Sequence, residues 1–157
     1  MKERNFIIKK LDSDLTNESR VKELWEVAET AYPEGSPWTL EQFQGIVSFD
    51  YLILFVAENL AGETIALLIA SKTMVEVDIY MLAVKSSHQR KGIARKLFKE
   101  LIKEARMKEL RNVFLEVRVS NLAAYNLYKS LGFQEIGRRK NYYSKPKEDA
   151  LMMKMNL

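Results

Sequence analysis

A glycine set among basic residues marks the place in this sequence where an anion could bind. The segment Gln89–Arg95 lies between a predicted strand and a predicted helix that is rich in lysine and arginine. A helix begins with unpaired backbone N–H groups and the positive end of its dipole, which together suit an anion. Gly92 and Ala94 are small enough to let phosphate oxygens approach the backbone. The alternative is that Gly92 only forms a turn.

Net charge is spread unevenly along the chain. Residues 1–84 hold 7 Lys and Arg against 14 Asp and Glu, whereas residues 85–111 hold 10 against 3 and residues 112–157 hold 8 against 4. A basic stretch is either a solvated helix face or a surface for a polyanion. Nucleic-acid binding usually brings interleaved aromatic residues, but Phe98, the only one in 85–111, falls on the predicted buried side. We therefore expect a phosphate-rich cofactor and no direct contact with nucleic acid.

A carboxylate in the middle of an apolar strand is the second feature that could do chemistry. The segment Val113–Val119 alternates, so Phe114, Glu116 and Arg118 share one face of the predicted strand and the valine and leucine side chains share the other. Burial of a carboxylate without a partner is expensive, so a glutamate is unusual here. The structural alternative is that Glu116 forms an ion pair with a neighbouring Arg or Lys at the sheet surface.

Composition excludes several classes of protein and site. The chain has 157 residues and a mass of 18.3 kDa, with 47% hydrophobic and 29% charged residues, so we expect one globular domain over residues 1–157. The absence of cysteine excludes disulfide scaffolds, thiolate nucleophiles, zinc–thiolate sites and iron–sulfur clusters. A single histidine, His88, disfavours a Ser-His-Asp triad. The sequence also lacks the P-loop motif G-K-[ST] and the dinucleotide motif G-x-G-x-x-G. No metal site is expected.

The sequence shows no targeting or membrane-spanning segment. Met1–Lys10 is mixed and charged, without the apolar stretch of a secretory signal. The longest apolar run, Tyr51–Ala57, has seven residues, whereas a membrane helix needs about 20. We expect a cytoplasmic protein with no membrane contact.

The elements that position these residues follow from the periodicity of apolar side chains. A period near 3.6 predicts helices over Ser19–Ala31, from Thr39 toward Ser48, over about 18 residues from Ile93, and over Asn121–Leu131 with Gly132 at its end. Alternation predicts strands over Tyr51–Glu58, Thr64–Ser71, Val75–Val84, Val113–Val119, Phe133–Arg139 and Ala150–Met155. The strand–helix–strand order favours an α/β domain with a mixed sheet.

The third predicted strand is expected to alternate without interruption. One face then holds Val75, Val77, Ile79, Met81 and Ala83, and the other holds Glu76, Asp78, Tyr80 and Leu82.

The strand–loop–helix junction resembles a known cofactor motif. Ala83-Val84 followed by Gln89-Arg90-Lys91-Gly92-Ile93-Ala94 is similar to the pyrophosphate motif Q/R-x-x-G-x-G/A of the GNAT acyltransferases, with Ala94 in place of a second glycine. The resemblance implies acetyl-CoA as cosubstrate and a mixed seven-stranded sheet flanked by about four helices. It implies that the cofactor is bound by Leu82, Ala83, Val84, Arg90, Lys91, Gly92, Ile93, Ala94, Arg95 and Asn121.

A narrower resemblance lies downstream. The stretches Leu115–Asn121 and Leu127–Phe133, with Ala123-Ala124 between them, resemble the RimI branch, the ribosomal-protein-alanine N-acetyltransferases. Pro37-Trp38-Thr39 with Phe43, and Arg139–Tyr143 with Glu148–Ala150, fit the same branch. The resemblance implies transfer of an acetyl group to the α-amine of a protein N-terminus, possible targets including a ribosomal protein. The longer loop Tyr32–Ser36 departs from the pattern.

The resemblance also assigns roles to individual residues. It makes Glu116 the general base, acting through a water, and Tyr128 the general acid, for direct attack in a ternary complex. Trp38, Tyr142 and Tyr143 would line the peptide groove. Each assignment has a structural alternative, which is an ion pair for Glu116, packing on the sheet for Tyr128, a helix cap for Asn121 and plain core for the groove aromatics.

Three functions remain open at this point. The first is a RimI-like N-terminal acetyltransferase. The second is a GNAT enzyme acting on a lysine side chain, a polyamine or another small amine. The third is a non-catalytic acyl-CoA-binding or RNA-associated module that docks through its basic helix.

Overall fold

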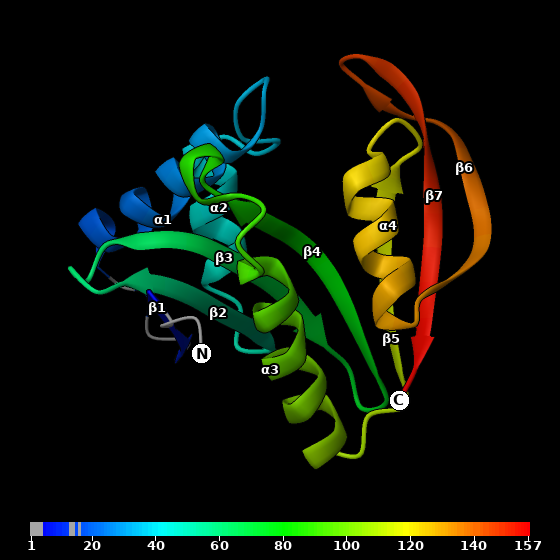
Figure 1. Cartoon of the computed structure of the whole chain (residues 1–157), viewed down its shortest axis with the longest axis horizontal. Coiled ribbons are helices and arrows are strands. Elements are labelled where there is room, and N and C mark those ends of the chain that lie inside the picture. Colours follow the sequence, from blue (N-terminus) through cyan, green and yellow to red (C-terminus); the bar gives the residue numbers. More distant parts are fainter. Residues whose placement is uncertain (1–4, 13–14, 16) are drawn as a thin grey trace.

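The computed structural model describes residues 5–12, 15 and 17–157, which form a mixed seven-stranded sheet with helices on both faces (Figure 1). In the order in which they pair, the strands are β1 (Phe6–Leu11), β2 (Leu52–Asn59), β3 (Thr64–Lys72), β4 (Glu76–Val84), β5 (Asn112–Arg118), β7 (Lys147–Asn156) and β6 (Gln134–Ser144). The helices are α1 (Glu18–Ala31), α2 (Leu40–Val47), α3 (Ile93–Met107) and α4 (Leu122–Leu131), and a 3-10 turn covers Ser86–His88.

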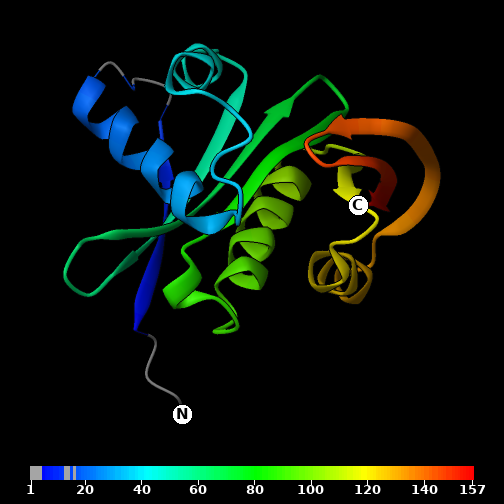
Figure 2. The same cartoon turned by 90° about the horizontal axis from the view of Figure 1, so that it is seen from above.

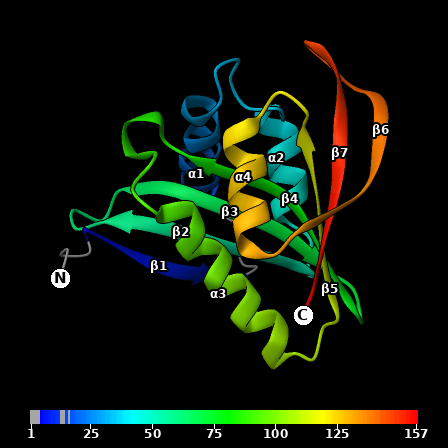
Figure 3. The same ribbon diagram turned by 45° about the vertical axis from the view of Figure 1, so that its right-hand side comes forward.

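The sheet opens in its middle. All neighbouring strands are antiparallel except β4 and β5, which are parallel and pair only from Glu76 opposite Asn112 to Asp78 opposite Phe114. Beyond Asp78 the two strands diverge (Figures 1 and 3). The second half of β4 therefore has a strand neighbour on one side only, and this opening lies at the centre of the molecule.

Two cores lie on opposite faces of the sheet. Helices α1 and α2 cover one face, and α3 and α4 cover the other (Figure 2). The helices pack their apolar stripes against the sheet. Helix α3 buries Leu97, Phe98 and Leu101, whereas on α4 Tyr128 is the one buried residue. A capping box starts α2, since Thr39 accepts from the Gln42 N–H and the Gln42 side chain accepts from the Thr39 N–H.

The predicted faces of β4 are wrong beyond its middle. The register against β3 shifts between Ile69 and Ala70, which leaves Tyr80 as an extra residue on β4. Such a bulge moves the following side chains to the opposite face. Val77 thus packs in the core under α3, whereas Met81 and Ala83 pack in the core under α1.

The edges of the sheet are longer than the alternation predicts. The strand β1 was not predicted from periodicity, because its exposed and half-buried positions include two adjacent lysines. It supplies the seventh strand that the family resemblance implies. The hairpin of β6 and β7 likewise extends to Ser144 and Lys147, beyond the predicted ends at Arg139 and Ala150. In the described part of the chain, no helix has the length and apolar character needed to cross a membrane.

Candidate active site

The loop before α3 has the backbone geometry of an anion site. Gly92 has a φ of +80° and precedes the first helical residue, and Arg90 also has a positive φ, of 63°. Gln89 braces the loop, because its Nε2 donates to the carbonyl oxygen of Val84 at 3.1 Å. Successive reversals of backbone handedness turn N–H groups toward a common point, which suits a phosphate.

The first turn of α3 has no side chain at its cap. Asn17, Thr39 and Asn121 each accept a hydrogen bond from a first-turn amide of α1, α2 and α4, respectively, but Gly92 has no side chain that could do so. The first amides of α3 are therefore available to an external acceptor. Arg90, Lys91 and Arg95 are exposed around them, and Arg95 Nη2 donates to Ser130 Oγ of α4 at 2.7 Å. These residues are the ones predicted to hold the pyrophosphate.

A tyrosine reaches the open part of β4 from the other face of the sheet. Tyr32, which follows α1, donates its hydroxyl to the Leu82 carbonyl at 2.9 Å. Leu82, Ala83 and Val84 were predicted to bind the cofactor, and they lie where β4 has no β5 neighbour. The pKa of Tyr32 is raised, mainly by burial and also by the nearby Tyr143. Sequence reasoning missed Tyr32, because it falls in the breaker-rich loop whose path the local pattern does not predict.

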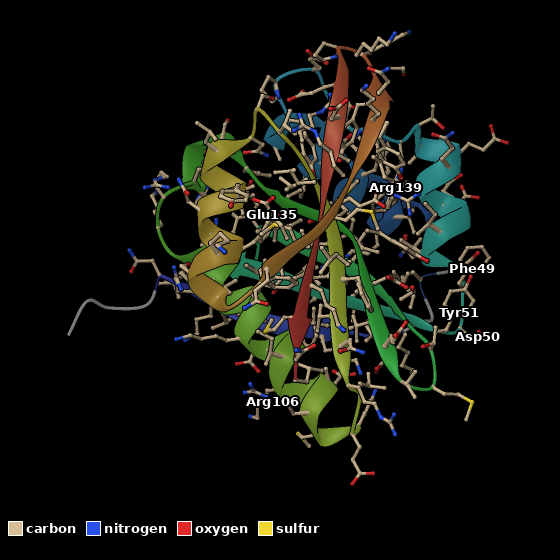
Figure 4. The ribbon with its side chains drawn as sticks, turned by 90° about the vertical axis from the view of Figure 1, so that its right-hand side faces the viewer. Phe49, Asp50, Tyr51, Arg106, Glu135 and Arg139 are labelled. Atoms are coloured by element: carbon tan, nitrogen blue, oxygen red, sulfur yellow. The ribbon has the colours of Figure 1, made fainter. Side chains whose placement is uncertain are left out.

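Glu116 lies on β5, on the face away from α4. Leu115 and Val117 point into the core beneath α3 and α4, so the residue between them faces the other way. The Glu116 Oε1 atom lies 2.8 Å from Arg139 Nε, and the glutamate side chain is 27% exposed. The ion pair that was the structural alternative to a catalytic role for Glu116 is therefore present. Figure 4 shows Arg139 on β6, in the upper part of the molecule.

Two tyrosines of β6 complete the surroundings of Glu116. The pKa of Tyr142 is raised, chiefly by the neighbouring Glu116 carboxylate. Burial raises the pKa of Tyr143 to about 12, with the negative charge of Glu116 adding to the effect. The Arg118 guanidinium lies 4.0 Å from the centre of the Tyr143 ring. The structure therefore brings together Glu116, Tyr142 and Tyr143, which were predicted, with Arg139, which was not assigned a role.

A bulge in β6 aims these tyrosines. The register against β7 shifts between Arg139 and Tyr143, and Asn141 has a φ of 51°. Asp149 of β7 holds the bulge, since it accepts from the Asn141 N–H at 2.7 Å and from Arg138 Nε at 2.7 Å. These bonds lower the pKa of Asp149, the backbone bond most of all. Asp149 is a second residue whose function sequence reasoning missed.

Tyr128 approaches the opening from the opposite side. It lies on α4, 8% exposed, with its ring centre 5.5 Å from that of Phe98 and 5.9 Å from that of Phe133. Burial raises the pKa of its hydroxyl, and the neighbouring Tyr32 and Tyr143 raise it further. The packing that was foreseen as the structural alternative is thus present.

The remaining predicted residues have clear structural roles. Asn121 caps α4 by accepting from the Ala124 N–H at 3.2 Å. Trp38 is half-buried against the core under α1, and its carbonyl accepts from Trp25 Nε1 at 2.8 Å. The loop Tyr32–Ser36 folds back on α1, because Glu29 accepts from the Ser36 N–H at 2.8 Å. In the part of the chain that the structure describes, no group of three or more His, Asp or Glu side chains is placed to hold a metal ion.

The sequence matches the acetyltransferase (GNAT) family over residues 18–133. The chain belongs to the GNAT acetyltransferases. The matched range runs from the start of α1 to the residue before β6 and includes the loop before α3, the open part of β4, Glu116 and Tyr128. The seven-stranded mixed sheet and the order of elements agree with this membership.

Within the family, this GNAT enzyme resembles the RimI branch. It is 36% identical over 119 residues to the ribosomal protein bS18-alanine N-acetyltransferase of Escherichia coli strain K12, covering 74% of this chain and 79% of that protein. The crystal structure of the ribosomal-protein-S18-alanine N-acetyltransferase from Escherichia coli superposes with a TM-score of 0.85 at 29% identity, over 96% of this chain and 93% of the other. The fold is also that of a chain in the NatC complex bound to Gag peptide and CoA, with a TM-score of 0.83 at 22% identity over 98% and 99% of the two chains.

Proposed function

We propose that this GNAT enzyme transfers the acetyl group of acetyl-CoA to the α-amine of a protein N-terminus, with an alanine of a ribosomal protein as the favoured target. The observation that carries the proposal is the position of Glu116. Its carboxylate lies beside the opening between β4 and β5, beneath the tyrosines of β6 and on the face opposite α4. An amine and an acyl donor can thus meet at the opening from opposite faces of the sheet. The cytoplasmic location expected from the sequence is part of the same proposal.

The residues present fit the acyl donor. The uncapped amides at Ile93, Ala94 and Arg95 would bind the pyrophosphate, with Arg90, Lys91 and Arg95 supplying positive charge. The backbone of Leu82, Ala83 and Val84 would bind the pantetheine arm, and the Asn121 side chain would add a hydrogen bond. When bound, acetyl-CoA supplies an acetyl group activated as a thioester.

The chain supplies the proton transfers. In the proposed reaction the amine nitrogen bonds to the acetyl carbon, the carbon–sulfur bond breaks, and Glu116 takes a proton from the nitrogen through a water. A peptide α-amine has a pKa near 8, so a modest base is sufficient. Tyr128 would donate a proton to the departing thiolate. Burial raises the pKa of Tyr128, which keeps the hydroxyl protonated but by itself opposes donation. The same burial would raise the pKa of a thiol beside it, which offsets that cost.

The aromatic residues of the acceptor side favour a peptide. Tyr142 is half-exposed beside Glu116, and Tyr143 lies deeper at the opening. An extended peptide could lie between the loop after α1 and the β6–β7 hairpin, with its amine at Glu116 and its first side chain against the tyrosines. The names of the bacterial relatives support an alanine as the first residue. Trp38 contributes by anchoring the loop rather than through an exposed ring.

The proposal is tested with two peptides of one sequence that begin with alanine and contain an internal lysine. One has a free N-terminus and the other a blocked N-terminus, and mass spectrometry locates the acetyl group after incubation with acetyl-CoA. We expect acetylation only of the free α-amine. Acetylation of the lysine in both peptides would instead support the lysine acetyltransferase alternative. Transfer to neither would overturn the choice of a protein acceptor.

A further inference from the structure

One side of α3 carries a row of exposed positive charges, which we name the basic stripe: Arg95, Lys99, Lys103 and Arg106. At about 100° per residue these four side chains fall within a sector of roughly 80° on the helix surface. The acidic residues of α3 lie outside this sector. Of these, Glu104 is already paired with Lys10 at 2.7 Å and Lys108 at 2.6 Å.

The basic stripe has no acidic partner among the residues that the structure describes. Its only side-chain hydrogen bond there joins Arg95 to the neutral Ser130. Arg95, Lys99 and Lys103 are successive i, i+4 neighbours, a spacing at which like charges destabilise a helix. An external polyanion would remove this repulsion.

The stripe forms one wall of a groove. A hollow of about 550 Å³ lies between α3 and α4, lined by the stripe residues together with Ile102, Met107, Ser130, Leu131 and Met155. The eleven steps along the helix from Arg95 to Arg106 span about 16 Å at 1.5 Å per step. Arg95 lies beside the phosphate loop, whereas Arg106 lies on the last turn, at the lower end of α3 in Figure 4. The groove thus leads away from the cofactor site.

We propose that Lys99, Lys103 and Arg106 of the basic stripe bind the phosphodiester backbone of RNA while acetyl-CoA occupies the phosphate loop together with Arg95. Regularly spaced phosphates match a regularly spaced row of cations, and contacts to the backbone need no aromatic side chain. The missing aromatics that argued against nucleic acid therefore exclude base stacking, not binding to the backbone. A membrane surface fits less well, since the groove is concave and Met107 is its one largely exposed apolar side chain.

The charge distribution of the molecule gives the complex an orientation. Residues 1–84 carry twice as many acidic as basic residues, and Glu23 and Glu26 are exposed on α1, across the sheet from α3. A polyanion is thus drawn to the α3 side and repelled from the α1 side. RNA on the stripe leaves the acceptor side, between the loop after α1 and the β6–β7 hairpin, free for a peptide.

The test measures the salt dependence of RNA binding. A fluorescent single-stranded RNA is titrated with the wild-type protein, with Lys99→Ala/Lys103→Ala, and with the control Lys22→Glu, all at saturating acetyl-CoA. The double variant and the control both lower the net charge by two, but Lys22 is exposed on α1. The test plots the logarithm of the RNA association constant against the logarithm of the salt concentration. Removing two phosphate contacts should reduce the magnitude of this slope by about 1.5 in the double variant, while Lys22→Glu keeps the wild-type slope.

Three results would overturn the inference. In the first, Lys22→Glu loses as much of the salt-dependence slope as the double variant does. In the second, adding acetyl-CoA abolishes RNA binding. In the third, polyglutamate displaces the RNA as effectively as unlabelled RNA does. The peptide assay on the same samples separates this inference from the proposed function. Peptide acetylation without RNA binding refutes only the basic stripe, and RNA binding without peptide acetylation refutes only the N-terminal acceptor.

Discussion

At the scale of single residues, the pairing of Glu116 with Arg139 defines how the site is held before an acceptor arrives. The guanidinium lies against one oxygen of the carboxylate that is proposed to take the proton of the amine through a water. Arg139 is about half exposed and lies on a strand that bulges just after it. A positively charged N-terminus could therefore take the place of the Arg139 guanidinium at the Glu116 carboxylate.

Glu116→Gln should lower kcat/KM for the free-N-terminus peptide by about 10²–10⁴-fold, because the amide cannot take the proton. Acetyl-CoA binding, measured by calorimetry, should stay at the wild-type level. The matched control is Glu135→Gln, since Glu135 binds Tyr125 of α4 and lies away from the opening. Equal turnover in Glu116→Gln and the wild type would remove Glu116 from the mechanism.

At the scale of elements, two irregular segments position the site, and both were hard to foresee. The faces of β4 are exchanged at Tyr80, because one extra residue enters a strand whose alternation looks regular. The bulge of β6 likewise depends on Asp149, which is eight residues from Asn141 in sequence. The alternation of apolar and polar side chains predicts where strands lie. It does not predict the residues at which the pairing register between two strands shifts.

Gly92→Ala should weaken acetyl-CoA binding by about 5–30-fold. A Cβ at Gly92 meets nothing within 4 Å, so the cost comes from its φ of +80°, about 1–2 kcal/mol for a residue with a side chain. Gly45→Ala is the matched control, because Gly45 lies inside α2 with equally open surroundings and a negative φ. Binding unchanged in Gly92→Ala would show that the loop does not need this conformation.

Asp149→Ala should release the β6 bulge and raise KM for the peptide by about tenfold, because the Asn141 N–H and Arg138 both lose their acceptor. KM for acetyl-CoA should change little, since Asp149 lies on the acceptor side. The pKa of Asp149 is lowered in the folded state. Its contribution to stability is thus present above its ordinary pKa of 3.8 and is lost as pH falls through the lower, folded-state value. An unchanged KM for the peptide would separate the bulge from acceptor binding.

At the scale of the whole molecule, much of the architecture could be predicted and the meeting of distant residues could not. The periodicity of apolar side chains and the resemblance to the GNAT family together predict the four helices, the mixed sheet, the phosphate loop and the importance of Glu116. Tyr32, Tyr128 and Tyr143 come from three elements far apart in sequence, and only the divergence of β4 from β5 brings them together. That divergence depends on tertiary packing, for which the local sequence has no signal.

These tyrosines should make the fold sensitive to alkali. Their folded-state pKa values are raised, that of Tyr143 to about 12. Their stabilising effect is therefore complete below about pH 10 and is lost as pH rises through the folded-state values, because the unfolded chain releases protons that the folded chain retains. Above pH 10, the free energy of unfolding of Tyr128→Phe should rise relative to that of the wild type by up to about 1.4 kcal/mol per pH unit. Urea unfolding between about pH 9 and 11 measures this, and parallel curves for the two proteins would contradict it.

The position of β7 between β5 and β6 fixes an order of assembly. The strand that carries Glu116 gains its second neighbour only when residues 147–156 have been synthesised, although β5 itself ends at Arg118. Until then β5 is an open edge, prone to pair with another chain. A growing polypeptide cannot complete the surroundings of Glu116 before the hairpin has closed, because Arg139, Tyr142 and Tyr143 lie on β6. Activity should appear in one step and late, when the last strand enters the sheet.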